Sequence, residues 1–462
     1  MLLQNLRRAL KDAEDKQKQG LRFSRSSAYF FLLECSKHED LDCCRLLRAL
    51  MVASKLDSIP VLADHLIRLF ASCGSLNEAN QVFENVVTPS KHTWCAIIAA
   101  HTKLGHHATS FELYDKMTAS GLESNKVLYL TILKSCINGM ALIQGRQVHH
   151  QIIKSGIQSD VMLVNSIIDM YAKCGSLDEA IKVFKAFQSR NVVSWNTIFA
   201  GCVRQGDFRN VVHFFELMQE EGIKPNIVSW GALIEGYAEH GDGLLALDSF
   251  DKMQGHGIKP DRVIFLSILK ACGSMGALNH GRHIHNLIVR MNSEDHDGVG
   301  NALIDMYSKC GSLAEAHRVL RRLCNRDVVS WNTIITAYAQ CGQAMDALWS
   351  FQCMQAEGIK PDDVTFINIL SSCCHAGLID ELKCHFMSMH VDYGIEPDIK
   401  HYSCMLDLFG QMGFLNEASN LRGSIQSDAI SRISILTACQ KHGNVELGGS
   451  CFIEDTIAKY KR

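Results

Sequence analysis

Near-identical segments recur along this 462-residue chain, and they constrain its fold more than any other feature. The text KCGSLDEA at 173–180 returns as KCGSLAEA at 309–316, and VVSWNTI at 192–198 returns unchanged at 328–334. The text GIKP also occurs more than once, each time followed by Asp or Asn. Self-similarity of this kind predicts a repeat architecture rather than one globular core.

The spacing of the tryptophans sets the period of the repeat. Trp94 and Trp195 are 101 residues apart, Trp195 and Trp230 are 35 apart, and Trp230 and Trp331 are again 101 apart. Three types therefore alternate, two of 35 residues and one of 31, between an N-terminal segment 1–25 and a C-terminal extension 429–462. The predicted repeats are 26–59, 60–90, 91–125, 126–160, 161–191, 192–226, 227–261, 262–296, 297–327, 328–362, 363–398 and 399–428.

Each repeat is expected to form two helices. In repeat 328–362, apolar residues recur at helical spacing over 331–338 and again over 347–354. Gly342 follows the first stripe as a helix C-cap, and Pro361 stops the second. One helix pair cannot bury its apolar face, whereas stacked pairs can. We therefore predict an all-α fold, an α-solenoid in the form of a right-handed superhelix of about 12 helix–turn–helix repeats, with a continuous concave groove.

Composition and charge mainly exclude certain classes of protein. The net charge of −3 gives no sign of a polyanion partner, so any basic surface must be local. No run of 18 apolar residues occurs, which argues against a membrane span, and the first 20 residues fit neither a secretory signal nor a good transit peptide.

The cysteines and histidines follow the repeat, which favours packing between helices over chemistry. The equivalent sets are Cys73, Cys174 and Cys310; Cys136, Cys272 and Cys373; and His149 and His285. The spacing of Cys373, Cys374, His375, Cys384 and His385 is unlike a zinc knuckle, so we predict no metal site and no cofactor.

The motifs together resemble the pentatricopeptide repeat family. The 35/35/31 alternation with VVSWNTI, GIKPD, NALIDMYSKCGSL and GRHIH is similar to its plant PLS subclass, and the resemblance extends over about residues 26–440. A second GIKPD-type repeat, 227–261, interrupts the usual order. Residues 435–449 resemble the start of the E extension of RNA-editing factors, although Arg432 replaces the usual Trp and the second half of the extension is missing.

In the family that extension is often followed by a DYW cytidine-deaminase domain. Such a domain needs an H-x-E and a C-x-x-C sequence to hold zinc and its activated water. Neither sequence occurs in this chain, so the resemblance implies no catalytic residue here.

The resemblance also implies which residues read RNA bases, because in the family the fifth and last residues of a repeat read one base. The pairs Asn165 with Asn191 and Asn196 with Asn226 resemble pyrimidine readers leaning to C, Asn301 with Asp327 and Asn332 with Asp362 resemble U readers, and Ser403 with Asp428 leans to G. The pairs Asp64 with Ser90 and Cys95 with Asn125 do not match the reading pairs of the family. Gly231 has no side chain to read a base, so its repeat leaves only Asp261. The middle-type repeats carry Leu130, Leu266 and Ile367 at the reading position, and these apolar side chains cannot form hydrogen bonds with a base. The structural alternative for each first-helix Asn is capping of its own helix.

Two further sets are implied along the groove. Apolar second residues would clamp the bases, namely Val193, Val228 and Val329. Basic thirteenth residues would contact phosphates, namely Lys103, Lys173, Arg204 and Lys309. The alternative for the basic set is a solvated helix face.

The resemblance implies a sequence-specific single-stranded RNA-binding protein of a mitochondrion or chloroplast. The favoured role is a C-to-U editing specificity factor that recruits a deaminase-bearing protein or other editing factors in trans. An RNA stability or processing factor and, from another class, a protein-interaction scaffold are the alternatives. Recurrent Asn/Asp pairs at one position disfavour the scaffold, and no membrane role is expected.

Overall fold

The computed structural model describes residues 2–291 and 298–412, which form 24 α-helices and no strand. The chain divides into two compact halves, residues 1–232 and 233–462, with the boundary inside α14 (Ile227–His240). The helices of the N-terminal half are α1 (Leu2–Lys18), α2 (Arg25–His38), α3 (Leu41–Ala53), α4 (Pro60–Ser72), α5 (Leu76–Glu84), α6 (Lys91–Lys103), α7 (His107–Ala119), α8 (Lys126–Asn138), α9 (Leu142–Lys154), α10 (Val161–Lys173), α11 (Leu177–Ala186), α12 (Val192–Arg204) and α13 (Phe208–Glu220). Those of the C-terminal half after α14 are α15 (Gly243–Gly255), α16 (Arg262–Met275), α17 (Leu278–Arg290), α18 (Val299–Lys309), α19 (Leu313–Arg322), α20 (Val328–Gln340), α21 (Ala344–Ala356), α22 (Asp363–Ala376), α23 (Ile379–Val391) and α24 (Ile399–Met412).

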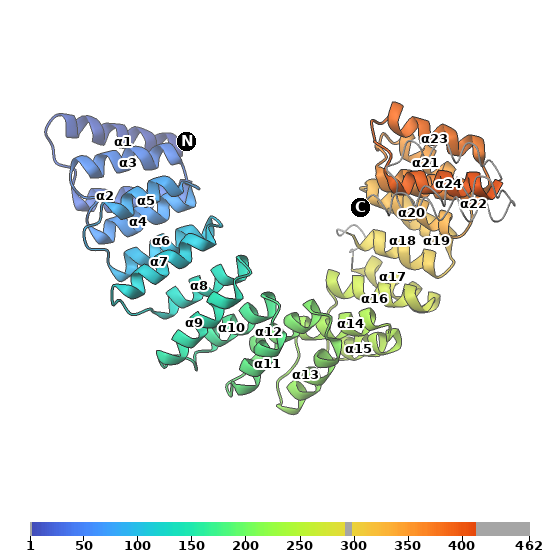
Figure 1. Cartoon of the computed structure of the whole chain (residues 1–462), viewed down its shortest axis with the longest axis horizontal. Coiled ribbons are helices and arrows are strands. Elements are labelled where there is room, and N and C mark those ends of the chain that lie inside the picture. Colours follow the sequence, from blue (N-terminus) through green and yellow to red (C-terminus); the bar gives the residue numbers. More distant parts are fainter. Residues whose placement is uncertain (1, 292–297, 413–462) are drawn as a thin grey trace, which may run out of the picture. The chain divides into compact units, whose positions relative to one another are not determined.

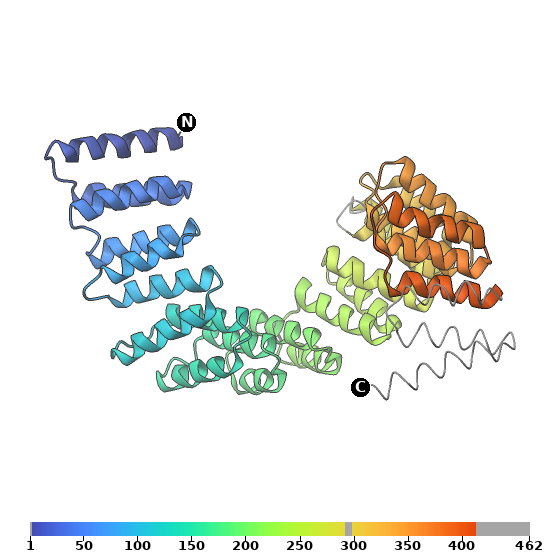
Figure 2. The same cartoon turned by 45° about the horizontal axis from the view of Figure 1, so that its top comes forward.

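Within each half, helix pairs stack on one another (Figures 1 and 2). The first helix of a repeat packs on its own second helix and on the first helix of the next repeat, as α10 does on α11 and α12. The predicted all-α solenoid of helix–turn–helix repeats is therefore confirmed. The structure of the N-terminal segment 1–25 was left open by the sequence. Most of this segment forms α1, and the Arg7 side chain donates a hydrogen bond to Asp40 at the start of α3.

In most of the described repeats the side chain of the last residue caps the first helix of the next repeat, although Ile59 forms no such cap before α4. The side chains of Asn191, Asp261, Asp327 and Asp362 each accept the backbone N–H three residues later, at 2.8–3.0 Å. These oxygens satisfy donors that a helix leaves unpaired at its start. Capping therefore belongs to the last residue of a repeat and not, as the structural alternative assumed, to the fifth. Ser24 caps α2 in the same way, so the first repeat begins at Arg25, one residue before the expected start of repeat 26–59.

The recurrent tryptophan lies in the core. Trp195 is fully buried, and its ring centroid is 4.7 Å from that of Phe184 on the preceding helix. Phe214 of α13 closes the cluster at 5.5 Å from Phe184. Edge-to-face contacts of this kind stabilise stacked helices beyond the area they bury.

The GRHIH and CGSL texts are two sides of one contact between neighbouring repeats. Arg282 of α17 forms an ion pair with Glu315 of α19 at 3.0 Å, and the His285 ring bonds the Tyr307 hydroxyl at 2.8 Å. Gly281 lies so close to α18 that an added Cβ would be 2.3 Å from the sulfur of Met306. Gly145, Arg146 and His149 repeat this contact in the N-terminal half with Met170, Glu179 and Tyr171.

The Gly281 contact predicts a stability effect. Gly281→Val should lower the free energy of unfolding by about 1–3 kcal/mol, because the new side chain overpacks a buried methionine. The same change at Gly255, a helical glycine with open space around its Cα, is the matched control. A thermal melt that shifts equally for both variants would show that helix propensity, and not packing, sets the effect.

The recurrent cysteines pack between helices as expected. The Cys174 thiol lies 3.6 Å from the backbone oxygen of Cys136, and Cys310 lies 3.7 Å from that of Cys272. Among the described residues no group of three or more His, Cys, Asp or Glu is placed to hold a metal ion. No helix in the described part of the chain has the length and apolar character needed to cross a membrane.

Candidate RNA interface

The fifth residues of the repeats occupy equivalent places on the first helices. Asn165, Asn196 and Asn332 are the fifth residues of α10, α12 and α20, and Asn301 is the third residue of α18, which begins at Val299. All four are at least half-buried. Ser403 has the same place in α24, whereas its proposed partner Asp428 lies outside the described residues.

In repeat 328–362 the two proposed reading residues contact each other. The Asn332 side-chain amide donates to Asp362 Oδ1 at 2.9 Å, and the Thr365 hydroxyl donates to Asn332 Oδ1 at 2.6 Å. The backbone N–H of Thr365 also donates to Asp362 Oδ1, at 2.9 Å. Burial disfavours the charged form of Asp362, but these hydrogen bonds outweigh it, so the pKa of Asp362 is lowered from its usual value.

Repeat 192–226 has the same three-residue arrangement with an amide in place of the carboxylate. The Asn196 amide donates to Asn226 Oδ1 at 3.2 Å, and the Ser229 hydroxyl donates to Asn196 Oδ1 at 2.7 Å. The backbone N–H of Ser229 donates to Asn226 Oδ1 at 3.1 Å. Because this N–H needs an acceptor, it fixes the orientation of the Asn226 amide.

The two arrangements leave different atoms for a ligand. Asp362 Oδ2 and Asn226 Nδ2 take part in none of the hydrogen bonds formed within the described chain. The free atom is an acceptor in the Asn–Asp pair and a donor in the Asn–Asn pair. Uracil presents a donor at N3 and cytosine an acceptor, so the two pairs complement different pyrimidines.

In the other two Asn-based pairs, the fifth and last residues do not contact each other through a hydrogen bond. No hydrogen bond joins Asn165 to Asn191, or Asn301 to Asp327, among the described residues, although Asn191 and Asp327 cap the next helices. Asn165 Oδ1 is buried without a donor. Sequence reasoning missed the role of the third residue, which in repeats 227–261 and 363–398 is a hydroxyl that links two repeats. The signal in these two repeats was the Ser or Thr two residues before the fifth position, at 229 and 365.

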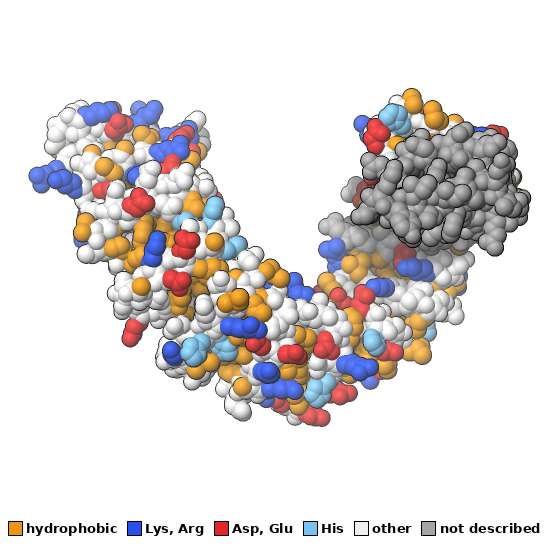
Figure 3. Space-filling model, in the orientation of Figure 1, with side chains coloured by type: hydrophobic (Ala, Val, Ile, Leu, Met, Phe, Trp, Pro, Cys, Tyr) orange, Lys and Arg blue, Asp and Glu red, His pale blue; other side chains and the backbone are white. Residues whose placement is uncertain are grey.

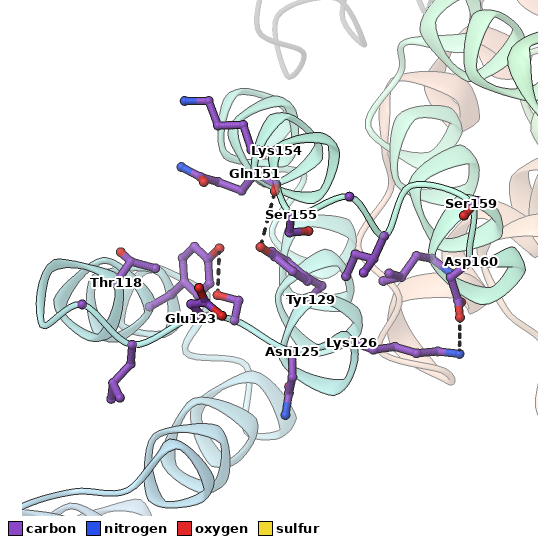
Figure 4. A pocket seen from close by; sticks show the side chains of 17 residues that line it. Thr118, Glu123, Asn125, Lys126, Tyr129, Gln151, Lys154, Ser155, Ser159 and Asp160 are labelled. Atoms are coloured by element: carbon purple, nitrogen blue, oxygen red, sulfur yellow. Dashed lines mark hydrogen bonds and ion pairs between the residues drawn. The ribbon is translucent and has the colours of Figure 1, made fainter.

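The middle-type repeat 126–160 is built differently (Figure 4). Its last residue, Asp160, accepts two backbone N–H groups on Oδ1, and its Oδ2 forms an ion pair with Lys126 at 2.7 Å. The hydrogen bond from Lys126 is the main reason that the pKa of Asp160 is lowered. Both carboxylate oxygens are thus occupied and Leu130 is apolar, so this repeat has no free polar group at the reading position.

The second residues form an exposed apolar set. Val193, Val228 and Val329 are 53–59% exposed, although each is the second residue of a helix with a buried core face. The same register holds further exposed side chains that the sequence reasoning left out: Val61, Val127, Met162, Val263 and Val364. Exposed aliphatic residues at one position of successive repeats are suited to contact the flat faces of bases.

The four basic residues end their helices and differ in pairing. Lys173 and Lys309 form ion pairs with Asp169 and Asp305 one turn earlier, both at 2.7 Å. Lys103 and Arg204 are exposed and form no ion pair within the described part of the chain. Cations also stabilise helix C-termini, which is the structural alternative for all four. On the face drawn in Figure 3, basic and acidic side chains are interspersed.

Comparison with known proteins decides the family. A model described as PPR repeat family matches residues 190–231, 225–274 and 326–375, and one described as PPR repeat matches 92–122, 163–192 and 301–328. A chloroplastic pentatricopeptide repeat-containing protein of Arabidopsis thaliana is 30% identical, over 84% of this chain and 67% of its own length. The chain belongs to the pentatricopeptide repeat family.

Other relatives extend the comparison. CRR2, a chloroplastic pentatricopeptide repeat-containing protein of A. thaliana, is 33% identical over 94% of this chain, which spans 63% of CRR2. The crystal structure of the maize pentatricopeptide repeat protein PPR10 matches with a TM-score of 0.68 at 18% identity, covering 98% of this chain and 72% of PPR10. This likeness shows the fold. PPR10 has also been solved in complex with an 18-nt psaJ RNA element, with a TM-score of 0.57.

Proposed function

We propose that this pentatricopeptide repeat protein binds single-stranded RNA in a sequence-specific manner in a plant organelle, chloroplast or mitochondrion. The proposed subclass is PLS, with a partial E-type extension at 429–462. The proposed role is to mark a cytidine for C-to-U editing by a deaminase supplied in trans, and no catalytic residue is assigned to this chain. The first helices carry the reading residues, and the exposed second residues flank the bases.

The observation that best supports base reading is the pair of free atoms beside the caps. Asp362 Oδ2 and Asn226 Nδ2 are left over after the same helix-capping geometry, yet one accepts and the other donates. Capping alone needs no fifth-residue amide bonded to the cap, as Asn332 is to Asp362. A ligand whose edge differs in one donor or acceptor accounts for both features.

Two experiments test the proposal. Selection from a random single-stranded RNA pool should return a defined consensus, and duplex RNA of that sequence should compete poorly because its base edges are paired. Comparison of organellar transcripts in plants with and without the gene should then show loss of C-to-U conversion next to a match to the consensus. Altered transcript ends or abundance with intact editing would favour the stability or processing role.

The exposed cations predict a salt-dependent contribution to binding. The slope of log binding constant against log salt concentration is negative for RNA binding, and each phosphate contact adds about −0.7 to it for single strands. Replacing both Lys103 and Arg204 with Ala should therefore make this slope less negative by about 1.4. Replacing Lys173 and Lys309 should have a smaller effect, because Asp169 and Asp305 compete for these cations.

Lys182 and Lys185, exposed on the second helix α11, are the control for total charge. Their replacement should leave the slope nearly unchanged. If the Lys103 and Arg204 variant has the same slope as this control, the basic residues are only a solvated face. The consensus sequence should be the same for all variants.

A further inference from the structure

Two cysteines from neighbouring repeats face each other near the N-terminal end of the chain. The Cys44 thiol of α3 lies 3.6 Å from the thiol of Cys73, the residue that follows α4. Cys44 is fully buried, whereas Cys73 is partly exposed. The two sulfur atoms are thus in contact, and rotation of the side chains would bring them to the bonding distance of about 2 Å.

This pair of thiols is a departure from the repeat pattern. Cys44, Gly145 and Gly281 are each the fourth residue of a second helix, in α3, α9 and α17. In the two repeats that have the glycine, the thiols that correspond to Cys73 lie against backbone oxygens, Cys174 at 3.6 Å and Cys310 at 3.7 Å. The thiol of Cys44 therefore gives Cys73 a reaction partner of its own kind at a place where the equivalent repeats have no side chain.

The surroundings of the two thiols set how fast they can react. Burial raises the pKa of the Cys73 thiol to about 12, and the neighbouring Cys44 adds to this effect. The pKa of Cys44 is also raised, first by its contact with the Cys35 thiol and then by burial. Because the thiolate is the reactive form, both thiols react slowly at neutral pH. Their proximity is what distinguishes them from other cysteines, and sustained oxidation is needed to link them.

We propose that Cys44 and Cys73 are an oxidative modification site, at which hydrogen peroxide produces a disulfide that links repeats 26–59 and 60–90. The sulfur of the Cys73 thiolate attacks one peroxide oxygen, and the O–O bond breaks. The second oxygen leaves as hydroxide, which takes up the proton that the Cys73 thiol released, and Cys73 becomes a sulfenic acid.

Cys44 completes the reaction. Its sulfur attacks the Cys73 sulfur, the S–O bond of the sulfenic acid breaks, and the oxygen leaves as water together with the Cys44 proton. The two thiols lose two electrons in total, and the peroxide is reduced to two molecules of water. Cys73 is the residue attacked first because it is the one that solvent reaches.

The disulfide would join helices that otherwise only pack on each other. Cys44 and Cys73 belong to successive repeats and are 29 residues apart in the chain. A covalent link across such a loop stabilises a protein mainly by restricting its unfolded state. Since each repeat of a stack contacts only its neighbours, the stabilisation should be confined mainly to α2, α3 and α4. This inference does not depend on RNA binding.

The test uses the full chain and hydrogen peroxide. After incubation, the remaining thiols are blocked with N-ethylmaleimide, and the peptides of a non-reducing digest are identified by mass spectrometry. Wild type should yield a peptide linked through Cys44 and Cys73, and Cys73→Ser should not. Cys174 is equivalent to Cys73 and also partly exposed, so it is the control within the same chain and should form no linked peptide.

Cys44→Ala separates the two steps of the reaction. This variant keeps Cys73 but has no thiol to consume its sulfenic acid, so dimedone, which traps sulfenic acids, should label Cys73 in the variant and hardly at all in wild type. Oxidation should slow amide hydrogen exchange in α2–α4 by about tenfold or more in wild type and leave it unchanged in Cys44→Ala. The inference is overturned if wild type keeps both thiols while the exposed Cys384 is oxidised, or if dimedone labels Cys73 equally in the two proteins.

Discussion

Replacement of Asn332 by serine should move the nucleotide preference of repeat 328–362 from uridine toward a purine. The Asn332 amide orients Asp362 through a 2.9 Å hydrogen bond and lies beside the free Oδ2 of that carboxylate. Serine is too short to keep that contact or to reach a pyrimidine edge, so the pocket gains room for a larger base. The loss of affinity for the wild-type RNA should be about tenfold, in the range of one base contact. Selection from a random pool and direct titration measure both effects.

Asn368→Ser is the matched control for this prediction. The Asn368 amide also joins α22 to α20, donating to the Thr336 hydroxyl at 2.7 Å, but it is the sixth residue of its repeat. Both variants lose an inter-repeat hydrogen bond and should lose similar stability, on the order of 1 kcal/mol. Only Asn332→Ser should change the consensus. If both proteins select the wild-type consensus, Asn332 serves only to hold the two repeats together.

The fold could be predicted from the sequence because the repeat fixes the same local choices many times. Gly342 and Pro361 mark helix ends in one repeat, and equivalent residues mark them in others. Contacts between repeats were harder to foresee. Arg282 and Glu315 are 33 residues apart and belong to different motifs, so nothing local shows that they form an ion pair.

The positions of the candidate reading residues could be predicted from the sequence, but their hydrogen bonds could not. The periodicity placed Asn196 and Asn332 at one position, and the structure adds that their partners cap the following helix. That detail depends on where each helix begins, which sequence patterns place only within a residue or two. The consequence is chemical, because the cap uses one atom of the last side chain and leaves the other for a ligand.

Asp362→Asn should therefore change the base read by this repeat from uridine to cytidine without unfolding the protein. Asparagine caps as well as aspartate, so its oxygen can keep the Thr365 N–H and the amide nitrogen takes the place of the free Oδ2. The repeat would then resemble 192–226, where Asn226 leaves its Nδ2 free. An acceptor for uracil N3–H becomes a donor for cytosine N3, and the preference between the two bases should change by about tenfold or more.

Two variants separate reading from capping and from charge. Asp362→Ala removes both functions, so it should lose base preference at this position and also about 0.5–2 kcal/mol of stability. Asp363→Asn removes the same charge from the exposed first residue of α22 and should leave the consensus unchanged. Affinities for RNAs that differ only in U or C at this position measure the change. An Asp362→Asn protein that keeps both its melting temperature and its uridine preference would show that the free carboxylate oxygen does not contact the base, and that Asp362 acts as a helix cap alone.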